Sequence, residues 1–119
     1  MAKHVMVVAD SCYSGTLTRS VEVPERTPNY LRQMAESRTR VVLSSGGLEP
    51  VIDSGGGKHS VFAAQFLQAL RDNILILDGV ALYQKVRQNV LWNAKQTPQY
   101  SAIRFAGHEG GDYLFVRRN

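Results

Sequence analysis

The sequence predicts an α/β fold in which a mostly parallel sheet and its flanking helices form three layers. Short apolar runs typical of buried strands alternate along the chain with segments of helical periodicity. Two of these runs end in polar turns that contain glycine, as strands of parallel sheets often do. No repeat, low-complexity segment or linker divides the 119 residues, so we expect a single unit.

Two apolar runs are predicted to be neighbouring parallel strands. Val5–Ala9 and Arg40–Ser44 are almost continuously apolar, a pattern typical of strands buried on both faces of a sheet. The first leads into the polar segment Asp10–Gly15 and the second into Ser45–Gly47. Parallel strands would bring both turns to one edge of the sheet, where open α/β sheets bind ligands. Shorter extended segments are expected at Ile103–Phe105 and Tyr113–Val116.

Helices are predicted from capping residues and apolar spacing. Thr27 and Pro28 are typical of a helix start, so we expect a helix over Pro28–Ser37 after a loop at residues 16–27. A second helix is expected over Ser60–Arg71. Asp78 is a candidate N-cap for a third helix, which Thr97-Pro98 would end. The residues expected to face inward from that helix are Val80, Tyr83, Val86 and Val90.

Composition argues against several classes of function. The net charge is +4, but the arginines are scattered along the chain, so we expect no nucleic-acid partner. No apolar run approaches the roughly 20 residues of a membrane span, and Asp10 interrupts the N-terminal apolar stretch, so we expect neither a membrane span nor a signal peptide. The single cysteine excludes an internal disulfide. A cytoplasmic protein is therefore expected.

Metal and cofactor chemistry finds no support in the sequence. His4, His59 and His108 are isolated, and no pair of them has the spacing of metal ligands. The glycine-rich stretch Gly55–Ser60 lacks the residues of a phosphate-binding loop. We therefore expect neither a metal nor a cofactor.

Cys12 is the candidate nucleophile, because it follows an apolar strand at the edge where a cleft is expected. A thiolate is a strong nucleophile when its surroundings lower its pKa. Asp10 and Ser11 stand where a structural core cysteine would have apolar neighbours. A tyrosine-phosphatase loop is excluded because Arg19 follows Cys12 after six residues, whereas that loop requires five.

The segment Ala9–Gly15, with the sequence ADSCYSG, resembles the nucleophile motif of metacaspases and bacterial caspase-like cysteine peptidases. Downstream segments resemble later parts of the same domain in the same order. The resemblance therefore covers essentially the whole chain and implies the C-terminal half of a caspase-like endopeptidase domain. The downstream segments are Arg40–Gly47, Lys58–Phe62, Gln96–Gln99 and Gly107–Phe115.

In that family a histidine from the preceding strand assists the cysteine, about 50 residues upstream of it in caspases. Only 11 residues precede Cys12 here, so we expect this histidine and the N-terminal half of the domain to be missing. His4 is excluded as the base because it lies about 25 Å from Cys12 along an extended strand. The strand Val5–Ala9 would lose a neighbour, and self-association through its edge is expected.

The resemblance also implies the substrate class, which is a protein or peptide. Metacaspases carry aspartate two places before the cysteine and cleave after arginine or lysine, so Asp10 is expected at the floor of the primary pocket. Ser44, Ser45 and Glu49 are the further candidate substrate-binding residues, with Asp53 as an alternative to Glu49. No acidic loop suggests calcium binding. The alternative function is an inactive caspase-like fragment or pseudo-enzyme that acts as a binding or assembly module.

Overall fold

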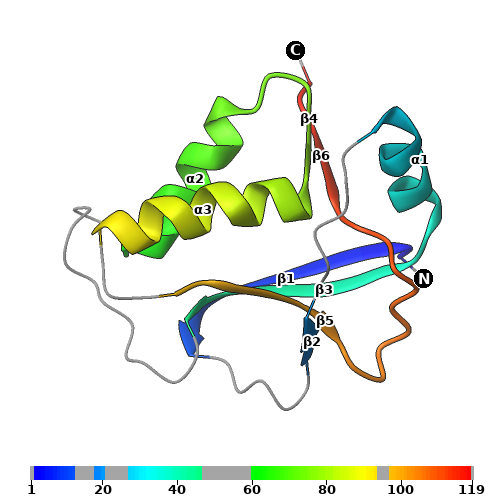
Figure 1. Ribbon diagram of the computed structural model, residues 1–119, viewed down its shortest axis with the longest axis horizontal. Coiled ribbons are helices and arrows are strands. Elements are labelled where there is room, and N and C mark those ends of the chain that lie inside the picture. The colour runs from blue at the N-terminus through cyan, green and yellow to red at the C-terminus, as the bar shows by residue number, and fades with distance from the viewer. Residues whose placement is uncertain (1, 13–17, 21–26, 47–59, 94–96, 119) are drawn as a thin grey trace.

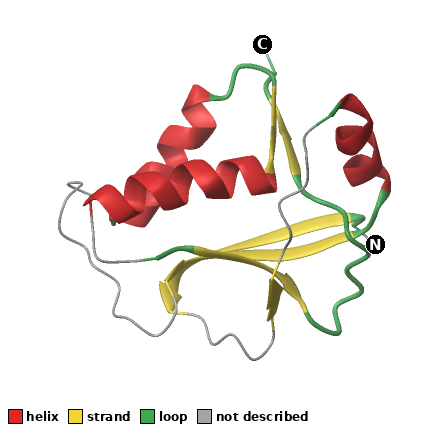
Figure 2. Cartoon of the chain, in the orientation of Figure 1, coloured by secondary structure: helices red, strands yellow, loops and turns green. Residues whose placement is uncertain are grey.

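The computed structural model describes residues 2–12, 18–20, 27–46, 60–93 and 97–118 (Figures 1 and 2). Strands and helices are interspersed along this part of the chain, which confirms a mixed α/β fold. The elements are β1 (His4–Cys12), β2 (Thr18–Ser20), α1 (Pro28–Glu36), β3 (Thr39–Gly46), α2 (Val61–Asp72), β4 (Ile76–Asp78), α3 (Gly79–Asn93), β5 (Gln99–Ile103) and β6 (Leu114–Val116).

The described strands form a four-stranded sheet in the order β1-β3-β5-β2 and a separate pair, β4-β6. β1 and β3 are parallel, as predicted, but β5 is antiparallel to both β3 and β2, and β4 is antiparallel to β6. The expectation of a mostly parallel sheet is therefore wrong for the described residues. Two helices, α2 and α3, connect β3 to β5 and return the chain to the end of the sheet where β3 finished (Figure 1). A parallel strand would have required a crossover to the opposite end.

The core lies between the four-stranded sheet and the helices α2 and α3. Val41 and Leu43 of β3 are 1% and 0% exposed and belong to one cluster with apolar residues of both helices. The predicted inward face of α3 is confirmed, because Val80, Val86 and Val90 are buried and Tyr83 stacks on Tyr100 with ring centroids 5.7 Å apart. All three helices lie on the same side of the sheet in Figure 1, and the three-layer arrangement stays a prediction.

The predicted helix starts are confirmed by their caps. The Thr27 hydroxyl accepts a hydrogen bond from the Tyr30 amide at 3.0 Å, and the Ser60 hydroxyl accepts one from the Ala63 amide at 3.0 Å. Asp78 accepts from the Ala81 amide at 3.2 Å. These bonds satisfy amides that have no partner within the helix, which is why local sequence is enough to predict where the helices begin.

The extended segments differ more from expectation. β1 continues through Cys12 and β3 through Gly46, so the polar residues expected in turns belong to strands. β2 lies inside the predicted loop at residues 16–27, and β4 was not predicted. β5 ends at Ile103 and a turn follows, so an extended Ile103–Phe105 is wrong. These strands exist because of their partners, which composition does not reveal.

None of the described helices is long and apolar enough to cross a membrane.

Candidate functional site

The C-terminal end of the β1–β3 pair is the candidate site. Ala9 pairs with Ser44 and Cys12 pairs with Gly46, which confirms that Cys12 and Ser44–Gly46 share one edge of the sheet. Three steps along β1 match two steps along β3, so β1 contains a bulge between Ala9 and Cys12. A bulge leaves one residue outside the hydrogen-bond ladder and turns nearby side chains; such irregularities are frequent beside active sites.

Asp10 is fixed to the start of α2 through Ser60. Its Oδ2 accepts a hydrogen bond from the Ser60 hydroxyl at 2.5 Å, while the same hydroxyl oxygen accepts from the Ala63 amide. Carboxylates are favoured near a helix N-terminus because its unpaired amides carry partial positive charge. Asp10 is exposed, and its place at the floor of a substrate pocket stays a prediction.

The neighbouring strand end is largely enclosed. Ser44 and Ser45 are 2% and 0% exposed, so their side chains do not line an open surface as a substrate-binding role would require. Gly46 differs, because a methyl group added there would meet no atom within 4 Å in the described part of the chain. Among the described residues, this space lies at the strand end where Gly46 pairs with Cys12. Glu49 and Asp53 lie outside the described residues.

The two described histidines lie at the opposite end of the sheet. His4 begins β1, about 25 Å from Cys12, and its Nε2 is 3.3 Å from the Met34 carbonyl oxygen. His108 Nδ1 accepts a hydrogen bond from the Arg40 amide at 3.0 Å, and Arg40 precedes Gly46 by about 20 Å of strand. Neither imidazole is placed to assist Cys12. His59 is not among the described residues, and within them no group of three or more acidic, histidine or cysteine residues could hold a metal ion.

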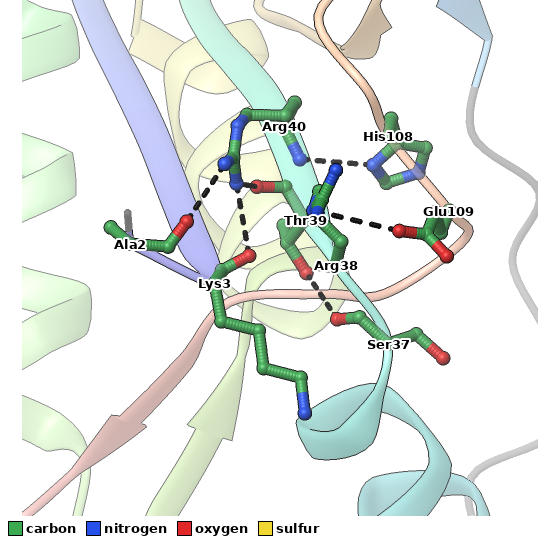
Figure 3. A network of polar contacts seen from close by, with 8 residues as sticks. All are labelled: Ala2, Lys3, Ser37, Arg38, Thr39, Arg40, His108 and Glu109. Carbon is green, nitrogen blue, oxygen red and sulfur yellow. Dashed lines mark hydrogen bonds and ion pairs between the residues drawn. The ribbon is translucent and has the colours of Figure 1, made fainter.

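Figure 3 shows what occupies that opposite end. Arg40 is 9% exposed, and its guanidinium donates to the carbonyl oxygens of Ala2, Lys3 and Thr39 at 2.7 to 2.9 Å. Beside it, Arg38 Nε lies 3.5 Å from Glu109 Oε1. A planar guanidinium satisfied by backbone acceptors ties the start of β1 to β3. We assign this end of the sheet a structural role.

A buried pair that the sequence did not predict joins β5 to the start of α3. The Tyr100 hydroxyl donates to Asp112 Oδ1, and Asp112 also accepts from the amides of Val80 at 2.9 Å and Tyr113 at 2.8 Å. Burial raises the pKa of Asp112, and these three hydrogen bonds offset only part of the rise. The pKa of Tyr100 is raised far above its usual range. Burial is the largest cause, and the charge of Asp112 is the second.

Gly79 makes this pair possible. A side chain at position 79 would run into the Tyr100 hydroxyl and the Asp112 carboxylate. Shifted pKa values occur both in active sites and in structural hydrogen-bond networks, so the exposure of the Tyr100–Asp112 pair to solvent distinguishes these two roles. Asp112 is 2% exposed and Tyr100 is 6% exposed, so the pair is structural. The sequence feature that could have indicated this pair is Asp78-Gly79, where a glycine directly follows a helix cap.

Comparison with known proteins identifies no relative of this chain. No protein-family model, no curated protein and no solved structure matches it. The interpretation of the site therefore depends on the motif around Cys12 and on the geometry of the strand end.

Proposed function

We propose that this chain carries the nucleophile end of a caspase-like cysteine endopeptidase, with Cys12 as the nucleophile. The observation that supports it best is the parallel pairing of β1 and β3, with the backbone of Cys12 opposite Gly46. Ligands bind at this edge in open α/β sheets. The proposal includes the finer fold, in which this chain is the C-terminal half of a three-layer domain.

In the proposed mechanism the Cys12 thiolate attacks the carbonyl carbon of the scissile peptide bond. The carbonyl oxygen becomes an oxyanion, which accepts a hydrogen bond from the Cys12 amide. The bulge between Ala9 and Cys12 supports this role, because an irregular ladder leaves backbone groups unpaired. A histidine supplied by the N-terminal half of the proposed domain protonates the leaving amine, and water then hydrolyses the thioester.

Asp10 would select a basic substrate residue before the cleaved bond. Ser60 holds Oδ2, and Oδ1 retains acceptor capacity for a guanidinium or ammonium group. Because Asp10 is exposed, solvent weakens the charge pair, and we expect a preference for arginine over a neutral residue of about fivefold, equivalent to about 1 kcal/mol. The expected order is arginine or lysine, then neutral residues, then aspartate.

Covalent labelling tests the proposal without requiring turnover. Peptidyl chloromethyl ketones that end in arginine, leucine or aspartate are added, and the modified residue is found by mass spectrometry. The Cys12 thiolate displaces chloride and forms a thioether. We expect the arginyl reagent to react fastest, Cys12→Ser to abolish labelling, and Asp10→Asn to remove the preference for arginine.

Gly46→Ala is a matched test of the site's position. The added methyl enters space beside Cys12, so it should slow labelling by the peptidyl reagents, while the rate with the small reagent iodoacetamide and the melting temperature stay unchanged. Equal rates for all three peptidyl reagents, no faster than those of a free cysteine derivative, would remove the peptidase proposal. The second candidate, an inactive binding or assembly module, is favoured by the distance of His4 and His108 from Cys12, and that result would support it.

A further inference from the structure

The outward face of α3 carries the chain's only tryptophan. Trp92 is 74% exposed and its neighbour Leu91 is 40% exposed, although the valines of the same helix are buried. A tryptophan side chain buries a large area in most folds, because its transfer out of water is favourable. Where it stays in water it is a frequent anchor of protein interfaces, in which tryptophan and arginine contribute most of the binding energy. Trp92 therefore marks a candidate docking surface.

The surface around Trp92 is a continuous stripe along α3. Positions 84, 87, 88, 91 and 92 follow one another at helical spacing, so they share one side of the helix over about 12 Å. An open hollow of about 430 Å³ lies over this stripe. All the described residues that line it are exposed, and they are Gln84, Arg87, Gln88, Leu91 and Trp92. The stripe is as long as about two turns of a second helix.

The proposed N-terminal half of the domain would not reach this stripe. α3 lies over β5, because Tyr83 stacks on Tyr100. β3 separates β5 from β1, so strands added beyond β1 would lie at least three strand spacings, about 14 Å, from β5. The stripe also faces away from the sheet, since Val86 and Val90 on the other side of α3 are 0% exposed and belong to the core. Trp92 therefore stays accessible in the complete domain.

The charges of α3 indicate which partner fits. Lys85 and Arg87 are exposed, and α3 contains no acidic residue. The acids of the preceding elements α2 and β4 are otherwise engaged: Asp72 accepts a hydrogen bond from Gln68 at 2.9 Å, and Asp78 is 0% exposed. Two cations thus lie beside an apolar anchor without an acid on the same helix. A ligand on the stripe gains affinity and orientation from negative charge.

We propose that the outward stripe of α3 binds an acidic amphipathic helix of a partner protein. An apolar side chain of the partner packs on Trp92 and Leu91, and its carboxylates pair with Arg87 and Lys85. Two cations are too few to hold a nucleic-acid strand, and one tryptophan with one leucine is too small an apolar area to enter a bilayer. The inference does not depend on the peptidase proposal, which concerns the end of β1.

Fluorescence tests the site directly, because the emission of the single tryptophan reports on Trp92. The probes are two tryptophan-free peptides of about 15 residues, long enough to form a helix, with leucines on one face. One peptide carries glutamates on the other face, and its counterpart carries lysines there. We expect the glutamate peptide to shift the emission of Trp92 to the blue and to protect it from quenching by iodide. The lysine peptide should do neither.

Variants of the stripe locate the contact, with the anisotropy of a labelled glutamate peptide as the readout. Trp92→Ala and Arg87→Glu should each raise the dissociation constant about tenfold. Arg87→Glu should also improve binding of the lysine peptide over that of the wild type. Phe105→Ala and Arg104→Glu are the matched controls, because Phe105 is 99% exposed and Arg104 is exposed beside it, in the turn after β5. Both should leave the dissociation constant unchanged.

Several outcomes would overturn the inference. They are no binding of the glutamate peptide, equal binding of the two peptides, and losses in the control variants as large as those in the stripe. A response of Trp92 to polyuridylate or to vesicles of phosphatidylcholine and phosphatidylserine, without a response to the glutamate peptide, would assign the stripe to another class of partner. Circular dichroism of each variant separates lost binding from a lost fold. Labelling of Cys12 by the arginyl reagent should be unchanged in Trp92→Ala, so the two proposals fail separately.

Discussion

Asp10 and Asp112 are both carboxylates at the start of a helix, yet the protein uses them differently. Asp10 is exposed and reaches α2 through the Ser60 hydroxyl. Asp112 is 2% exposed, accepts hydrogen bonds from Tyr100, Val80 and Tyr113, and has a raised pKa. An enclosed carboxylate at a helix start, such as Asp112, thus stabilises the fold. An exposed one, such as Asp10, remains accessible to a ligand.

The largest effect on stability is expected at Gly79, because the Tyr100–Asp112 pair occupies the space that a side chain at this position would need. Gly79→Ala forces a methyl group against Tyr100 and Asp112, and should lower the free energy of unfolding by about 3 kcal/mol or more. Gly46→Ala, at the open edge, should change it by less than about 1 kcal/mol. Urea denaturation of both variants measures the difference. Equal losses would mean that the two regions are packed alike.

Tyr100→Phe is expected to have the next largest effect, about 1–2 kcal/mol, because it removes one donor from a buried carboxylate. Burial raises the pKa of Tyr100, so the contribution of its hydroxyl is complete below the ordinary tyrosine value of about 10 and is lost as the pH rises above it. The deficit of the variant should therefore shrink in strong alkali. A deficit independent of pH would contradict the assignment.

Asp112 also makes a contribution to stability that decreases as the pH rises, but this decrease occurs at acid pH. Because burial raises its pKa, the folded chain holds this proton more tightly than the unfolded chain, and stability falls as the pH rises from about 3.9 through the raised value. Asp112→Asn removes that fall. Urea titrations from acid to neutral pH should show the variant gaining on the wild type as the pH rises.

A smaller effect is expected for Ser60→Ala, which removes the cap of α2 and the bond to Asp10. It should lower the free energy of unfolding by about 1 kcal/mol. Thr27→Ala is the matched control, because Thr27 caps α1. Only Ser60→Ala should also reduce the preference of Cys12 for the arginyl reagent. The same reduction in Thr27→Ala would show that the cap of α2 has no special connection to the site.

No effect is expected from replacing the two described histidines. His4→Ala and His108→Ala should leave the alkylation rate of Cys12 unchanged, because both side chains lie at the far end of the sheet. We also expect no measurable hydrolysis of an arginyl peptide by this chain alone, since loss of general acid–base assistance typically costs about 10²–10⁴-fold. Turnover that disappears in Cys12→Ser and in either histidine variant would require a different site.

Local features of the sequence were enough to predict the helices and part of the site. Thr27, Ser60 and Asp78 satisfy nearby amides, and the inward residues of α3 recur at helical spacing. The apolar runs of β1 and β3 likewise predicted that Cys12 and Gly46 would meet at one edge. Each of these interactions depends on few residues, or on a pairing rule that parallel strands share.

The sequence by itself therefore determined the capped helices, the two apolar strands and the motif that contains Cys12. The expectation that both strands are buried on both faces holds for β3 and is wrong for β1, where Val7 and Val8 are 45% and 41% exposed. Only the tertiary structure decided that β5 returns antiparallel, that Ser44 and Ser45 are enclosed, and that Asp10 is exposed. It also decided the meeting of Tyr100 with Asp112 beside Gly79. The physical reason is range. Capping and periodicity act over one or two helical turns, whereas burial and strand pairing depend on residues far apart in the chain, which composition and spacing do not specify.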